Sequence, residues 1–63
     1  MNLNKLRGLR AEKRLSQKAL ADLIGMPSAT YISKEQGKSD FKVNEIIKIA
    51  DALNVDKSIF FDD

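Results

Sequence analysis

The sequence predicts an all-α protein, a compact bundle of five helices that forms one domain over residues 1–63. Apolar residues recur three or four positions apart along five segments, and no segment shows the alternating pattern of a strand. Capping residues or glycines bound these segments. A domain of 63 residues buries only about 60% of its unfolded surface. We therefore expect neither a second domain nor a deep catalytic cleft.

The first two helices follow from apolar spacing and from caps at their ends. Residues 3–13 form the first helix, with Asn2 or Asn4 as its N-cap and with apolar positions at Leu3, Leu6 and Leu9. Ser16 caps the second helix, and Gly25 ends it in the left-handed conformation. We expect its buried face to consist of Leu20, Leu23 and Ile24.

The remaining helices fill the second half of the chain. The third begins around Pro27 or Ser28 and stops at Gly37, and a polar loop follows. The fourth has the strongest period and ends at Asn54; its wide apolar stripe is Val43, Ile46, Ile47, Ile49, Ala50 and Leu53. Asp56 caps a short fifth helix, whose residues 59–61 are too apolar for one turn to hide.

Residues 16–38 combine two of these helices into a recognisable motif. A first helix of two turns is followed by the break Gly25-Met26-Pro27 and by a second helix whose N-terminal half can enter a major groove. This spacing is typical of a helix-turn-helix, which we place at about residues 16–36. The motif predicts binding to duplex DNA.

Charge is distributed unevenly along the chain. Residues 1–18 carry six cations and one carboxylate, a net charge of +5, whereas residues 43–63 carry two cations and five carboxylates, a net charge of −3. One end therefore attracts phosphates and the other repels a polyanion. The alternative explanation of the basic segment is a solvated helix face, which we favour less than a surface that attracts phosphates.

Composition argues against several other classes of protein. There is no cysteine and no histidine, so disulfide frameworks, Cys/His zinc sites and histidine-based acid–base chemistry are excluded. We expect no enzyme activity, no catalytic residue, no cofactor and no metal. No segment has the length of a membrane span or the pattern of a signal peptide, so we expect a cytoplasmic protein without a membrane partner.

Three segments together resemble a known family: LRGLRAEKRLSQKALADLIGMPSATYISKEQGKSDF, VNEIIKIADALNV and SIFF. They are similar to Cro/repressor-type (XRE family) helix-turn-helix domains, in particular to small Cro-like regulators of Gram-positive bacteria and their phages. The resemblance covers almost the whole chain and implies a lambda-repressor-like fold. It further implies a sequence-specific regulator of transcription, a repressor, that binds a pseudo-palindromic operator in double-stranded DNA as a homodimer.

The resemblance also assigns roles to residues outside the recognition helix. Arg10 and Glu35 match a structural ion pair between the first and third helices. A partner explains a carboxylate near a helix C-terminus better than the helix dipole does, since that end favours cations. The residues expected to contact DNA phosphates are Gln17, Lys18, Arg10, Lys38 and Lys42.

The third helix carries the positions that the family aims at base edges: Ser28, Ala29, Thr30 and Ser33, with Lys34 behind them. These side chains are mostly short, so direct base readout is expected to be modest and DNA shape to carry part of the discrimination. Tyr31 falls at a core position. Pro27 lacks a capping oxygen, so Ser28 is the alternative cap, which leaves open whether Ser28 or Ala29 faces the groove.

The C-terminal segment is expected to mediate a weak homodimer that DNA strengthens. Its contact is predicted at Ile59, with Val55 and Lys57 at the edge, while Phe60 or Phe61 fills the core. The alternative reading is an antitoxin or another protein-interaction module on the same fold. The residues alone do not separate the two.

Overall fold

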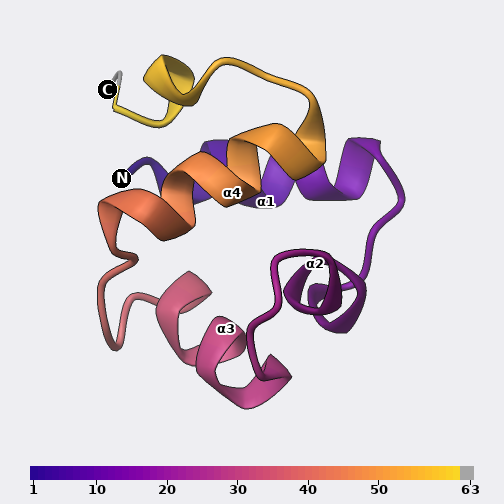
Figure 1. Cartoon of the computed structure of the whole chain (residues 1–63), viewed down its shortest axis with the longest axis vertical. Coiled ribbons are helices and arrows are strands. Elements are labelled where there is room, and N and C mark those ends of the chain that lie inside the picture. Colours follow the sequence, from indigo (N-terminus) through magenta and orange to yellow (C-terminus); the bar gives the residue numbers. More distant parts are fainter. Residues whose placement is uncertain (62–63) are drawn as a thin grey trace.

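The computed structural model describes residues 1–61 and contains four α-helices and one 3₁₀ turn (Figure 1). In chain order they are α1 (Leu3–Glu12), α2 (Gln17–Leu23), α3 (Ser28–Glu35), α4 (Val43–Leu53) and the 3₁₀ turn η1 (Lys57–Phe60). No strand occurs in this part of the chain, as expected for an all-α protein. The expected count of five α-helices is wrong. The last segment has only four residues, too few to follow the costly first turn of an α-helix with further hydrogen bonds.

Helix α4 runs across the middle of the molecule, with α1 behind it in the view of Figure 1. Helices α2 and α3 pack against each other on one side of α4, and η1 packs against α4 and α1 on the other. The two ends of the described chain meet, because the backbone N–H of Asn2 donates to the carbonyl of Phe60 with an N···O distance of 2.7 Å. The helix-turn-helix pair and the chain ends therefore occupy opposite sides of α4.

Local capping explains where most of these elements begin. Asn2 caps α1 by accepting from the Lys5 N–H at 3.0 Å, and Ser16 caps α2 by accepting from the Ala19 N–H at 3.0 Å. Asp56 caps η1 in the same way, with its carboxylate 2.9 Å from the Ser58 nitrogen. Gly25, after α2, has the expected left-handed conformation with φ +71°, and Asn54, where α4 was expected to end, is left-handed as well, with φ +57°.

Helix α3 begins where it was expected, but Ser28 is not its cap. Pro27 occupies the N-cap position, with φ −57° and ψ 137°, and Ser28 is the first helical residue. Pro27 has no side-chain oxygen, so α3 begins without a capping hydrogen bond from a side chain.

The core is built from every element of the bundle. Its largest fully buried apolar side chains are Leu6, Leu20, Tyr31, Ile49, Leu53 and Phe60. Phe60 is thus the aromatic residue that fills the core, whereas Phe61 is 54% exposed. No helix among residues 1–61 is long and apolar enough to cross a lipid bilayer.

Two expected core faces are narrower than the sequence pattern indicated. Leu23 is 62% exposed, and the buried residues at the end of α2 are Leu20, Ala21 and Ile24. On a helix of 3.6 residues per turn, positions 20, 21 and 24 share one face and position 23 points away from Ala21. On α4, Val43 and Ile47 are likewise exposed at the edge of the stripe.

Candidate nucleic-acid interface

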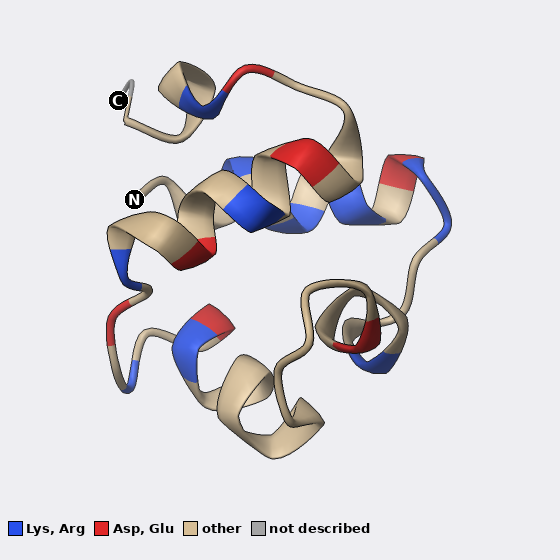
Figure 2. Ribbon diagram, viewed as in Figure 1, with Lys and Arg blue, Asp and Glu red and all other residues tan. Residues whose placement is uncertain are grey.

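The exposed side of α3 carries most of the residues that the sequence assigned to base contacts. Ala29 and Thr30 are exposed in its first turn, and Ser28 and Ser33 are half-buried. Tyr31 points the other way, into the core. Figure 2 shows that α3 carries no charged residue until its C-terminal end. This face therefore offers hydroxyl and methyl groups, and no long cation, to a groove.

The turn before α3 is held by backbone hydrogen bonds. The Met26 N–H donates to the Ala21 carbonyl at 2.9 Å, and the Gly25 N–H donates to the Asp22 carbonyl at 3.2 Å. The positive φ of Gly25 allows the chain to reverse between α2 and α3 without the strain that a side chain would add. These bonds close the C-terminal end of α2, and α3 then packs directly against α2.

A buried polar network joins α1, α2 and α3 behind this motif. Glu35 is 1% exposed, and its carboxylate accepts from Arg10 Nε at 3.1 Å and from Arg10 Nη2 at 3.0 Å. Gln17 Nε2 donates to the same carboxylate at 3.2 Å. The structure therefore contains the ion pair that the resemblance implied, and it adds Gln17 as a third member.

The opposite charges of Arg10 and Glu35 keep both side chains ionised. Burial alone would raise the pKa of Glu35, but the hydrogen bonds and charge of Arg10 hold that pKa below its usual value of 4.5. The same contacts raise the pKa of Arg10. Burial first, and then the neighbouring Glu35 carboxylate, raise the pKa of Tyr31, whose hydroxyl lies beside this pair without a hydrogen bond of standard geometry within the described residues. At neutral pH the pair is a buried carboxylate and guanidinium.

Because Arg10 and Gln17 belong to this network, their side chains are less free to turn toward a DNA phosphate. Arg10 also donates through Nη1 to the Leu15 carbonyl at 2.8 Å, so three of its donor groups are used inside the protein. Gln17 is half-buried in the first turn of α2, and its amide is oriented by Glu35. The phosphate contacts expected of both residues stay predictions, with Gln17 the better placed.

Arg7 has a structural role that the sequence reasoning missed. Its Nη2 donates to the backbone carbonyl of Glu35 at 3.0 Å, and its Nη1 donates to the Asn4 side chain at 2.8 Å. A cation at the C-terminus of α3 interacts favourably with the helix dipole and with a carbonyl that lacks a helical partner. Only the packing of α1 against α3 reveals this contact, because the two residues are far apart in sequence.

Lys34 is oriented toward α4. Its Nζ lies 2.7 Å from Glu45 Oε1, and its side chain is only 11% exposed. The same oxygen accepts from the Lys42 backbone N–H at 2.7 Å, so Glu45 caps α4 while pairing with Lys34. A base contact by Lys34 requires this ion pair to open.

The other expected phosphate contacts are exposed lysines around the motif. Lys38 lies in the loop after α3, and Lys42 stands at the N-cap position of α4. Lys18 pairs with Asp22 at 3.1 Å on the surface of α2, where both side chains are well exposed and the pair is weak. All three can turn toward a phosphate without breaking the core.

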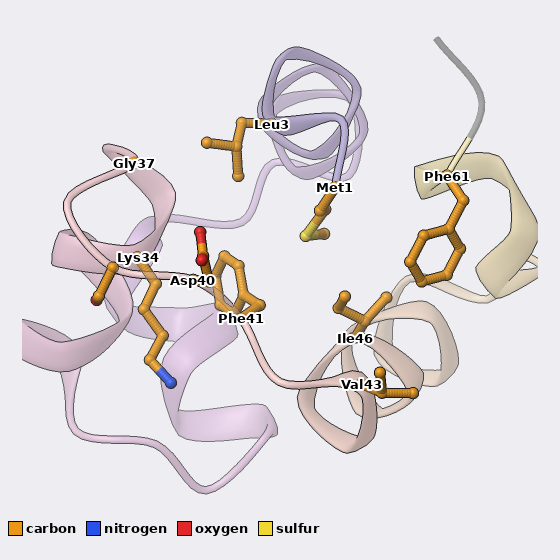
Figure 3. A pocket seen from close by; sticks show the side chains of 10 residues that line it. Met1, Leu3, Lys34, Gly37, Asp40, Phe41, Val43, Ile46 and Phe61 are labelled. Carbon is orange, nitrogen blue, oxygen red and sulfur yellow. The ribbon is translucent and has the colours of Figure 1, made fainter.

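The expected dimer residues lie on the far side of α4. Val55 and Ile59 are half-buried against the core, and Lys57 is exposed. More apolar surface is exposed nearby at Phe61, which lines a cleft of about 350 Å³ with Met1, Leu3, Phe41 and Val43 (Figure 3). Asp62 and Asp63, which contribute to the acidic end, lie outside the described residues.

Comparison with models of known protein families gives a match over most of the chain. The model of a family described as helix-turn-helix matches residues 6–60, which include α1 from Leu6 onward and the whole of α2, α3, α4 and η1. A search among curated proteins found no match. Within residues 1–61 no group of three acidic, histidine or cysteine side chains is arranged to hold a metal ion.

Proposed function

Because the chain belongs to the helix-turn-helix family of Cro/XRE type, a family of DNA-binding transcription regulators, we propose that it represses transcription as a homodimer on a pseudo-palindromic operator. The observation that carries the proposal is the first turn of α3. Its exposed residues Ala29 and Thr30 stand on a helix that packs against α2, and the flanking Lys38 and Lys42 form no ion pair with any of residues 1–61.

Base readout in this proposal comes from α3. Ser28, Thr30 and Ser33 supply hydroxyl groups that accept or donate to several bases, and Ala29 packs against a thymine methyl group. None of these side chains makes the bidentate contact by which arginine selects guanine. Sequence-dependent shape and deformability of the DNA therefore supply part of the specificity.

Phosphate contacts fix the position of α3 in the groove. Gln17, Lys18, Lys38 and Lys42 are the contacts we assign, and each stands on the rim of the helix-turn-helix. Because phosphate binding releases counterions, affinity should fall steeply with salt, with a slope that reflects roughly four to eight phosphates per dimer. Selection from a random duplex pool first identifies the preferred sequence, and titrations at several salt concentrations then give the slope. Absence of binding at low salt would refute the proposal.

Variants distinguish the two kinds of contact. Ser33→Ala should weaken the preferred site more than random DNA, by roughly 1 kcal/mol, whereas Lys42→Ala should weaken both equally. Loss of selectivity from Lys42→Ala, with none from any change on α3, would contradict the assignment of α3 as the recognition helix.

The dimer is the second part of the proposal. An isologous contact centred on Ile59, with Val55 and Lys57 at its edge, would set the two α3 helices about one DNA turn, roughly 34 Å, apart. Ile59→Asp should keep binding to a half-operator while losing cooperative filling of the whole operator, as a gel-shift titration would show. Since Ile59 is half-buried, a thermal melt must show that the variant is folded. Wild-type cooperativity in a folded variant would place the contact elsewhere, with exposed Phe61 as the next residue to change.

A further inference from the structure

A second cleft lies next to the recognition helix, between the turn of the helix-turn-helix and the first half of α4. It has a volume of about 240 Å³. Residues 24–27 and Thr30 form one wall. Lys42, Asn44, Glu45 and Lys48 of the α4 segment form the other. Thr30 thus belongs both to this cleft and to the exposed face of α3.

Among the described residues that line this cleft, Glu45 alone carries a carboxylate, and that carboxylate already has partners, so the remaining charge is positive. Glu45 Oε1 accepts from Lys34 Nζ and from the Lys42 backbone N–H, each at 2.7 Å. Lys42 and Lys48 are exposed, and neither forms an ion pair with any residue in the described part of the chain. Two ammonium groups and the Asn44 amide therefore face the cleft without an anionic partner.

Lys48 and Asn44 lie one turn apart on α4, which places them on the same face of the helix. Lys42 precedes that helix, so its side chain approaches the cleft from the other end of the wall. DNA carries a phosphate charge about every 1.7 Å along its axis. A duplex that receives the exposed face of α3 must therefore bring part of its backbone past the mouth of a cleft that shares Thr30 with that face.

We propose that this cleft binds one backbone phosphate of the DNA, held by Lys48 and Lys42 with Asn44 as a hydrogen-bond donor. The inference rests on the proposed function and adds a contact to it. The sequence alone assigns no role to Lys48, because there it is a solvated cation on an amphipathic helix. The fold places it beside the turn formed by residues 24–27. The contact does not depend on the DNA sequence, and it helps to position α3 in the groove through the neighbouring residues of the α4 segment.

The test uses Lys48→Gln, Lys42→Gln and the double variant, with Lys5→Gln as the matched control. Lys5 is another exposed lysine, in the first turn of α1, and it does not line the cleft. Binding is measured on a short duplex that accommodates one subunit, so that dimer contacts do not contribute, and on a random duplex of the same length. Thermal melts establish that each variant retains the wild-type fold.

Lys48→Gln should weaken both duplexes equally, by about 3- to 10-fold at low salt, and should flatten the salt dependence. The double variant should lose less than the product of the two single losses, because both lysines serve the same phosphate. An effect of Lys48→Gln no larger than that of Lys5→Gln, with wild-type DNA binding intact, would overturn the cleft while leaving the proposed function in place. No DNA binding by the wild type would instead overturn both.

A free anion is the competing occupant of such a site. Titration of the wild type with inorganic phosphate at constant ionic strength, followed through the amide resonances of Thr30 and Asn44, separates the two. We expect these resonances to move with the short duplex and to stay unchanged with millimolar inorganic phosphate. Saturable movement with inorganic phosphate, combined with unchanged DNA binding by Lys48→Gln, would assign the cleft to a free anion and refute the DNA contact.

Discussion

Replacing Glu35 by glutamine should destabilise the protein severely while barely changing the shape of the side chain. Glu35 is 1% exposed and accepts three hydrogen bonds, at 3.1 and 3.0 Å from Arg10 and at 3.2 Å from Gln17. In Glu35→Gln the amide turns one donor toward the guanidinium and leaves Arg10 without a counter-charge. Breaking a buried pair on one side costs about 3–5 kcal/mol. We expect the lower end, about 3 kcal/mol, because the Arg10 side chain is 17% exposed and can be partly hydrated.

The magnitude can be compared with the total stability of a domain of 63 residues. At roughly 0.05–0.15 kcal/mol per residue, that total is about 3–9 kcal/mol, so the variant should lose a third or more of it. Urea denaturation followed by circular dichroism measures the difference. The double variant Arg10→Met with Glu35→Leu should be less destabilised than Glu35→Gln, because it leaves no unpaired charge in the core. A loss below about 1 kcal/mol for Glu35→Gln would refute the reasoning that the pair is buried and mutually dependent.

Three further predictions concern the fold. Burial alone would raise the pKa values of Glu35 and Glu45, but hydrogen bonds from Arg10 and Lys34 hold both below 4.5; stability should therefore be complete above that pH and fall as pH drops through the lowered pKa values. In thermal melts between neutral and acid pH, the melting temperature should fall less steeply for Glu35→Gln than for the wild type. An equally steep fall would exclude Glu35 as a source of the pH-dependent stability. Leu20→Ala should cost about 2–5 kcal/mol and exposed Leu23→Ala within about 0.5 kcal/mol by urea denaturation, whereas equal losses would contradict the observed face of α2. Gly37→Ala should cost about 1–2 kcal/mol through backbone strain at φ +85°; a steric clash contributes nothing, because the new Cβ would meet only Leu3, at an ordinary 3.7 Å. Gly8→Ala, inside α1, should instead stabilise the protein by roughly 0.5–1 kcal/mol. Denaturation midpoints that move in the same direction for both variants would refute this contrast.

Features that depend on near neighbours in the sequence could be predicted. Ser16 and Asp56 cap the helices that follow them, and Gly25 takes the left-handed conformation, because each of these outcomes depends on a few adjacent residues. Leu23 shows the limit of apolar periodicity. A leucine at a helical interval satisfies the pattern, but the partner that covers one face of α2 is set by packing, and that face includes the small Ala21 instead.

The candidate site shows the same division. The pairing of Arg10 with Glu35 was predicted from a family resemblance. A physical reason supported it, because a carboxylate near a helix C-terminus is unfavourable unless a cation pairs with it. The contacts of Arg7 with α3, of Lys34 with Glu45 and of Lys48 with the cleft depend on which helices lie side by side. A single sequence gives the charge of these residues but not their direction.

The hydrogen bond between Asn2 and Phe60 has a kinetic consequence. It joins the first and last elements of the bundle, and Phe60 is the fully buried side chain that η1 contributes to the core. The contacts within α2 and α3 are local and can form early, whereas this closure must wait until nearly the whole chain has been ordered. Substitutions at Phe60 should therefore act mainly by accelerating unfolding, and those at Leu20 should also slow folding. The seam where the chain ends meet is the part of the bundle that assembles last and opens first.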